Sequence, residues 1–96
     1  MARWGLIVEQ NVGYERRMWQ ARVVGHVDGT REEALAELRR RAECFDPERP
    51  GRVVRRRLYR DRDGFLLVLE SKWSAVFHFR FMVAEELYDS APPDPA

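Results

Sequence analysis

Four basic side chains that could hold an anion lie on two segments far apart in the sequence. Arg22 and His26 belong to one segment, and His78 and Arg80 belong to the other. Both segments alternate polar and apolar residues as β-strands do, and the alternation places all four on one side of their strands. Arginine binds carboxylate or phosphate with a two-pronged fork, and histidine titrates near neutral pH. A cluster of the four could bind a small anionic ligand. It could also belong to an enzymatic dimer whose facing sheets enclose the cluster.

A plainer role for these residues is structural. At the margins of a sheet they would pair with acids such as Glu9 and Glu70. Because protein interfaces are themselves rich in arginine, the sequence favours this interpretation. The two histidines lack a third ligand at the spacing of a known motif, so no metal site is predicted.

The densest basic run surrounds a predicted hairpin that also carries Tyr59 and Phe65. Aromatic rings beside arginines can stack bases while the guanidinium groups hold phosphates, so nucleic-acid binding is an alternative function. Asp61 and Asp63 dilute the charge, and no signature of an RNA-binding module is present. An edge strand whose charges deter aggregation is the simpler interpretation. The arginines concerned are Arg55, Arg56, Arg57, Arg60 and Arg62.

Catalytic motifs are absent from the sequence. It has no P-loop, no G-x-S-x-G elbow and no H-E-x-x-H zinc motif. Ser71 and Ser74 flank Lys72, but no partner base can be placed beside them. We therefore predict no catalytic residue and no cofactor, and a non-enzymatic function is the expectation.

Length and composition describe one globular domain. The 96 residues are 45% hydrophobic and 34% charged, with a net charge of +1, and such a chain can bury a modest core without metals or disulfides. Cys44 is the single cysteine, which fits a reducing compartment. No apolar run would span a bilayer and no signal-peptide pattern is present, so we expect a cytoplasmic protein without membrane contact. Residues 1–89 are assigned to one domain and residues 90–96 to a disordered tail.

The chain uses arginine almost to the exclusion of lysine. Of its 17 Lys and Arg residues only Lys72 is a lysine, and residues 91–96 contain only Ala, Pro and Asp. In these two respects the chain resembles small proteins of high-GC actinobacteria. The resemblance is one of composition; it rests on no motif and implies no activity.

One long strand at residues 73–83 determines the predicted architecture, because Phe77, Phe79 and Phe81 share one face of it at period two. A helix that starts after Thr30, with Glu33 completing a capping box, carries an apolar stripe and should cover that aromatic face. Strands are predicted at 4–10, 18–27, 52–60 and 65–70. The fold class is therefore α+β: an antiparallel five-stranded sheet with one helix on one face, in the order β-β-α-β-β-β.

The sequence also predicts which face of the sheet some residues occupy and where one turn lies. Trp19 and Val23 should lie under the helix, and Val24 on the opposite face. Asp63-Gly64 should form a turn in which the glycine supplies a positive φ. The register of 52–60 stays open, since only a bulge would reconcile its apolar residues. Residues 84–89 could continue the last strand or form a helical turn.

The second face of this sheet has no predicted cover. A large exposed apolar patch usually marks an interface. The principal prediction is therefore a non-enzymatic interaction module that forms a homodimer, or docks a protein partner, through this face. The interface candidates are Ile7, Val24, Val76 and Met82.

Overall fold

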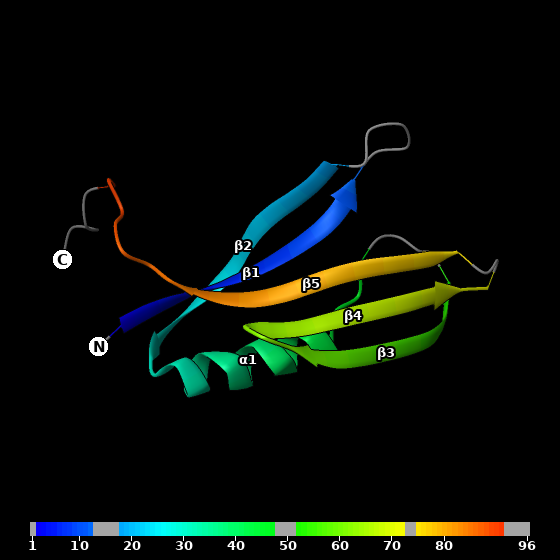
Figure 1. Cartoon of the computed structure of the whole chain (residues 1–96), viewed down its shortest axis with the longest axis horizontal. Helices are drawn as coiled ribbons and strands as arrows, with labels where there is room; N and C mark the ends of the chain where they lie inside the picture. Colours follow the sequence, from blue (N-terminus) through cyan, green and yellow to red (C-terminus); the bar gives the residue numbers. More distant parts are fainter. Residues whose placement is uncertain (1, 13–17, 48–51, 73–74, 92–96) are drawn as a thin grey trace.

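The computed structural model describes residues 2–12, 18–47, 52–72 and 75–91, and it confirms the predicted α+β fold. Its elements are β1 (Ala2–Val12), β2 (Met18–Gly29), α1 (Arg31–Glu43), β3 (Val53–Asp61), β4 (Gly64–Ser71) and β5 (Val76–Glu85). The strands form one antiparallel sheet in the order β2-β1-β5-β4-β3 (Figure 1). Residues 73 and 74, predicted to begin a strand, and residues 92–96, predicted to form a disordered tail, lie outside the described residues.

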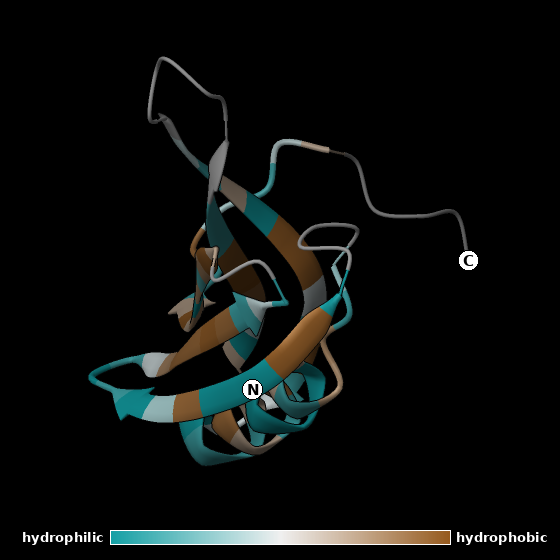
Figure 2. Ribbon diagram, turned by 90° about the vertical axis from the view of Figure 1, so that its right-hand side faces the viewer, coloured by the Kyte–Doolittle hydropathy of each residue, from teal (hydrophilic) through white to brown (hydrophobic). Residues whose placement is uncertain are grey.

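The helix crosses the sheet because the two strands that it joins lie at opposite edges. β2 forms one edge and β3 the other, so the chain between them must pass over one face. On this path α1 contacts β1, β2, β4 and β5, and Figure 2 shows it on one side of a curved sheet. The described part of the chain contains no second helix, so no described element forms a layer on the opposite face.

Local signals determine where α1 begins. The Glu33 backbone N–H donates to the Thr30 hydroxyl (3.1 Å), and the Thr30 backbone N–H donates to the Glu33 carboxylate (3.3 Å). This is the predicted capping box, which satisfies two backbone donors that the first turn leaves without partners. The helix then buries Ala34, Leu38 and Ala42 against the sheet.

The aromatic face of β5 forms the core beneath the helix, as predicted. Phe79 and Phe81 are 4% and 1% exposed. Phe45, which follows α1, packs edge-on against both rings with centroid separations of 5.1 Å, a geometry that aromatic pairs prefer. The sheet completes the core with Leu6, Val8, Phe65, Leu67, Leu69 and Val83.

A β-bulge in β2 reverses the facing of half of that strand. Leu6 pairs with Gly25 but Ile7 pairs with Val23, so Val24 is an extra residue. Val24 consequently packs against the core, whereas Val23 lies on the opposite face and is 55% exposed. The predicted positions of both residues are therefore wrong.

The same bulge removes Trp19 from the core. Trp19 lies two pairs beyond Ala21 in an alternation that starts at Val23, so it shares the uncovered face and is 54% exposed. Its predicted place under the helix is wrong, because one inserted residue moves every residue before it in β2 to the opposite face of the sheet.

A second bulge settles the register of β3. Val53 pairs with Ser71 and Arg55 pairs with Glu70, which leaves Val54 as the extra residue. Val53 and Leu58 both pack against the core, although they are separated by an odd number of positions, and Val54 is 63% exposed.

Gly64 serves a different purpose from the one that the turn pattern predicts. Gly29 is the glycine with a positive φ (153°) in the described chain, so the expected positive φ at Gly64 is wrong. A Cβ at Gly64 would instead lie 1.8 Å from the Phe81 carbonyl oxygen. Gly64 is therefore required by the close approach of β4 to β5.

β5 continues as a strand to Glu85, which decides between the two alternatives for the start of residues 84–89. The Glu86 N–H donates to the Arg3 carbonyl (2.8 Å), and residues 86–90 have no regular structure. No helix in the described ranges combines the length and apolarity needed to cross a membrane.

The Glu37 carboxylate predicts an acid-dependent contribution to stability. Hydrogen bonds from Arg40 (2.6 Å) and Arg41 (3.1 Å) lower the pKa of Glu37 from 4.5 to about 2. Because the folded-state pKa is the lower one, this contribution is complete above about pH 4.5 and is lost as the pH falls through about 2. We expect Glu37→Gln to destabilise the protein at neutral pH, by an amount that shrinks across that window. Urea unfolding of both proteins at several pH values measures the difference in their free energies of unfolding. A difference that does not change with pH would contradict the prediction.

Candidate interaction surface

The sheet face opposite α1 is the candidate functional surface, and we call it the open face. Cross-strand pairing arranges its side chains in rows that run across the strands. Val23, Ile7 and Met82 lie directly opposite one another on β2, β1 and β5, and we call them the apolar row. Gly5 and Ala84 pair in the adjoining row and extend the surface with small residues. Three neighbouring strands thus carry one continuous apolar strip.

Exposure shows that this strip remains in contact with solvent. Val23 is exposed, Ile7 and Met82 are half-buried, and Ala84 is exposed. Farther along the same face, Val76 is 51% exposed and Tyr59 is 46% exposed. The open face therefore keeps large apolar side chains in water on β2, β3 and β5, whereas Val68 of β4, on the same face, is only 7% exposed.

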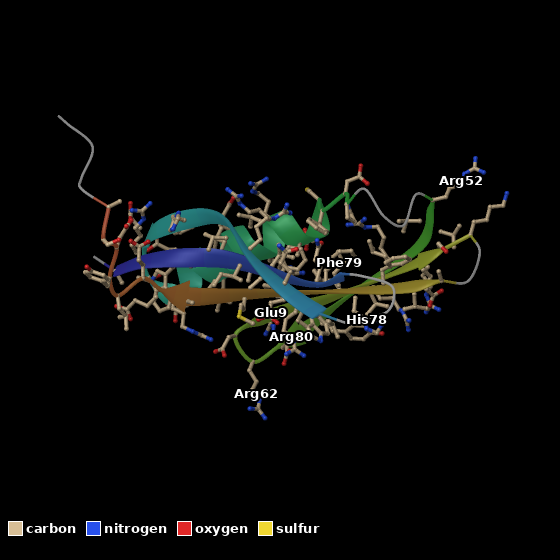
Figure 3. All side chains as sticks on the ribbon, turned by 90° about the horizontal axis from the view of Figure 1, so that it is seen from above. Glu9, Arg52, Arg62, His78, Phe79 and Arg80 are labelled. Atoms are coloured by element: carbon tan, nitrogen blue, oxygen red, sulfur yellow. The ribbon has the colours of Figure 1, made fainter. Side chains whose placement is uncertain are left out.

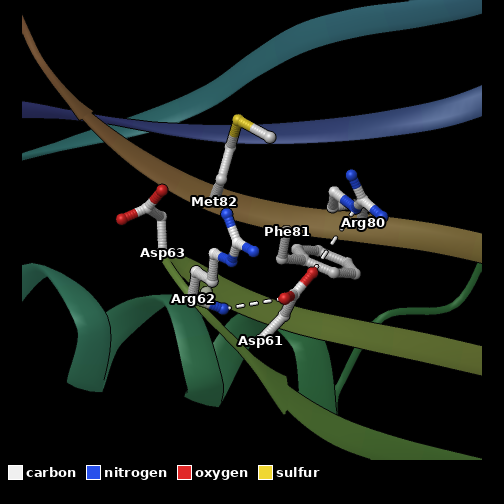
Figure 4. Close-up of a pocket in the computed structure, with 7 residues that line it drawn as sticks. Asp61, Arg62, Asp63, Arg80, Phe81 and Met82 are labelled. Carbon is white, nitrogen blue, oxygen red and sulfur yellow. Dashed lines mark hydrogen bonds and ion pairs between the residues drawn. The ribbon is translucent and has the colours of Figure 1, made fainter.

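A charged row borders the apolar row on its other side. Glu9 of β1 and Arg80 of β5 are directly opposite each other, and Figure 3 shows both on the side of the sheet away from Phe79. Arg80 Nε lies 3.7 Å from Asp61 Oδ2, within a cavity of about 350 Å³ beside the β3–β4 turn (Figure 4). Among the described residues the Glu9 carboxylate has no ion pair or hydrogen bond. One acid on the open face is thus left without a cation, beside an arginine that contacts a different acid.

Three of the four predicted interface residues lie on the open face. Ile7 and Met82 are at the centre of the apolar row, and Val76 lies at the far end of β5. Val24 lies on the other face because of the bulge in β2. The alternation of the sequence therefore located the surface but exchanged Val24 for Val23.

The predicted basic cluster does not assemble. Arg22 pairs with Val8, a core residue, and therefore lies on the helix side of the sheet. His26 Nε2 lies 3.2 Å from the Glu86 carboxylate, and its row is three rows away from the row of His78. The expectation that all four share one face is wrong for Arg22, again because of the inserted residue.

The arginine-rich hairpin divides its charges between the two faces of an edge strand. Arg56 donates to the Glu43 carbonyl at the end of α1 (3.1 Å), where a cation complements the helix dipole. Arg57 donates to the Glu70 carboxylate (3.0 Å), and Arg55 lies 4.0 Å from the same carboxylate. Arg60 pairs with Phe65 on the helix side, and Arg62 is in the turn. The run forms no single basic surface.

Several residues of the open face were missed at the level of sequence. Val23, Trp19 and Tyr59 are exposed there, and Ala84 adjoins the apolar row. The adjacent valines 23 and 24 held the one local signal, because either could continue an apolar alternation. Only the pairing with β1 shows that Val24 is the inserted residue.

The side chains of the open face offer apolar contact and ion pairing. No group of three or more metal-binding side chains lies close together in the part of the chain that the structure describes. Comparisons of the chain with protein-family models, with curated proteins and with solved structures return no match.

Proposed function

We propose that this protein is a small non-enzymatic interaction module that binds a second copy of itself through the open face. The observation that carries the proposal is the apolar row of Val23, Ile7 and Met82, which no described element covers. Burying apolar area contributes roughly 25 cal/mol per Å², so an uncovered row of this kind favours association. The single cysteine is consistent with a cytoplasmic setting, which is part of the proposal.

The charges of the open face favour a second copy over a strongly charged partner. Alongside the apolar row the face carries both signs, with Glu9, Asp61 and Glu70 against Arg55, Arg57 and Arg80. Nucleic acid would require an excess of positive charge directed at phosphates. Two balanced faces can meet without net repulsion, and two-fold pairing is the commonest arrangement of identical chains.

A charge at Val23 tests the proposal. Val23 is exposed in the monomer, so Val23→Glu should fold normally, whereas in a dimer it would bury a carboxylate without a partner. Size-exclusion chromatography with light scattering is expected to show a dimer for the parent at tens of micromolar and a shift to monomer for the variant.

Val54→Glu is the matched control, because Val54 is 63% exposed and belongs to the distant edge strand β3. It should leave the dimer intact, and circular dichroism should show both variants folded. A parent that stays monomeric up to hundreds of micromolar would rule out self-association. If the parent, Val23→Glu and Val54→Glu all formed the same dimer, the interface would lie elsewhere.

A further inference from the structure

The register of β1 and β5 makes the open face complementary to itself about one particular axis. We infer that two copies pack with the two-fold axis parallel to the strands and above the seam between β1 and β5, so that Glu9 of each copy binds Arg80 of the other. This inference rests on the proposed self-association and specifies its geometry. β1 and β5 are neighbours within the sheet, with β2 on one side and β4 and β3 on the other, so the seam is close to the centre of the open face.

The axis exchanges the positions of β1 and β5. A residue of β1 in one copy then lies above the β5 residue of the other copy that shares its row. The pairs in question are Gly5 with Ala84, Ile7 with Met82, and Glu9 with Arg80. Each pair occurs twice, as a two-fold interface requires. Because the axis runs along the strands, the two sheets meet nearly aligned, which is a common way for sheets to stack.

Under this axis each row of one copy lies over the same row of the other copy, and the side chains of each row are complementary to themselves. Gly5 and Ala84 have small side chains, which let two sheets approach closely. Ile7 and Met82 are half-buried and apolar, so each would remove the other from water. Glu9 and Arg80 carry opposite charges.

A two-fold axis perpendicular to the strands would be poorly suited to the same face. An axis of that kind along the apolar row would place the charged row over the row of Gly5 and Ala84. Glu9 and Arg80 would then lie over Gly5 and Ala84 and lose water without a charge directly across the interface, which is unfavourable. His26, the β2 member of that row, is one strand away and already contacts the Glu86 carboxylate. The distribution of charge along the strands thus selects the axis along the seam.

The monomer leaves the required groups available. In the described chain the Glu9 carboxylate has no ion pair, although Arg80 is opposite it on the neighbouring strand. Arg80 is 48% exposed, and its 3.7 Å contact with the exposed Asp61 is loose. Such an exposed pair contributes little, so the guanidinium can turn toward a carboxylate of the partner.

Charge reversal at the two positions tests this geometry, with the parent, Glu9→Arg, Arg80→Glu and the double variant compared by sedimentation equilibrium. Each single variant places two like-charged pairs in the dimer, so its dissociation constant should rise by about a hundred-fold or more. The double variant Glu9→Arg/Arg80→Glu restores both opposite-charge pairs and should dimerise as the parent does. An equimolar mixture of the two single variants should form a heterodimer, because one chain then supplies two arginines and the other two glutamates. Native mass spectrometry separates this heterodimer from either homodimer.

The mixture distinguishes contacts between copies from a contact within one chain. A Glu9–Arg80 pair within each chain would also be restored in the double variant, but mixing would restore nothing. Single variants that dimerise as the parent does, or monomeric single variants whose mixture stays monomeric, would overturn the axis while leaving the proposed function standing. A monomeric parent would overturn both. Circular dichroism and thermal unfolding verify that all four proteins are folded.

Discussion

Gly64→Ala is expected to destabilise the protein by about 3 kcal/mol or more, although it adds a single methyl group. The new Cβ would lie 1.8 Å from the Phe81 carbonyl oxygen and 2.9 Å from the Met82 Cα. These obstacles are backbone atoms, so a side-chain rotation cannot relieve the collision. The strands β4 and β5 would have to separate where the Val83 N–H donates to the Asp63 carbonyl (3.0 Å). Urea unfolding monitored by tryptophan fluorescence measures the loss.

Gly5→Ala supplies a matched control for that measurement. Gly5 is also a buried glycine of the sheet, but a Cβ there would meet its nearest neighbour, the Ala84 carbonyl oxygen, at an ordinary 3.6 Å. With both variants and the parent unfolded at protein concentrations where they are monomeric, we expect its effect to stay within about 1 kcal/mol of the parent, because the loss of unfolded-state freedom offsets small adjustments. Equal destabilisation by the two substitutions would show that the close approach of β4 to β5 is not the reason for Gly64.

Sequence reasoning succeeded where the determining interactions are local. The capping box needs only Thr30 and Glu33, three residues apart, and the structure forms both of its hydrogen bonds. The aromatic face of β5 likewise follows from strict alternation within one strand, and Phe79 and Phe81 are buried as expected. The prediction of a single helix then implied an uncovered sheet face, and the described residues contain no second helix.

It failed where a neighbouring strand decides the outcome. One inserted residue at Val24 exchanges the faces of everything before it in β2, which moved Arg22 away from the predicted basic cluster and brought Val23 to the open face. Within residues 18–29 the adjacent valines 23 and 24 are the one local signal, and they do not show which residue is inserted, because the bulge is defined by its pairing with β1. Gly64 shows the same limit. The turn sequence predicted a special φ, whereas the backbone of β5 imposes the requirement.

The existence of the open face was therefore predictable from the sequence, but the arrangement of side chains on it was not. Its existence depends on the number of layers, which composition and periodicity reveal. Its rows depend on which residue of β1 pairs with which residue of β5, and Glu9 and Arg80 are 71 positions apart in the printed numbering. Only the folded sheet shows that these two side chains share a row.

Phe79→Ala is expected to cost about 3–5 kcal/mol, the range for truncating a buried aromatic residue. Phe79 is 4% exposed, and its ring packs edge-on against Phe45 at 5.1 Å, so truncation removes apolar contact and leaves a cavity between β5 and the residue that follows α1. For a domain of this size the loss corresponds to a fall in the melting temperature on the order of 15 °C or more. Tyr88→Ala removes a similar ring from a position that is 83% exposed and should change the melting temperature by only a few degrees, since surface substitutions are usually within about 0.5 kcal/mol. An unfolding midpoint that Phe79→Ala leaves unmoved would place Phe79 outside the core and would remove the reason for assigning α1 to this face, and with it the identity of the open face.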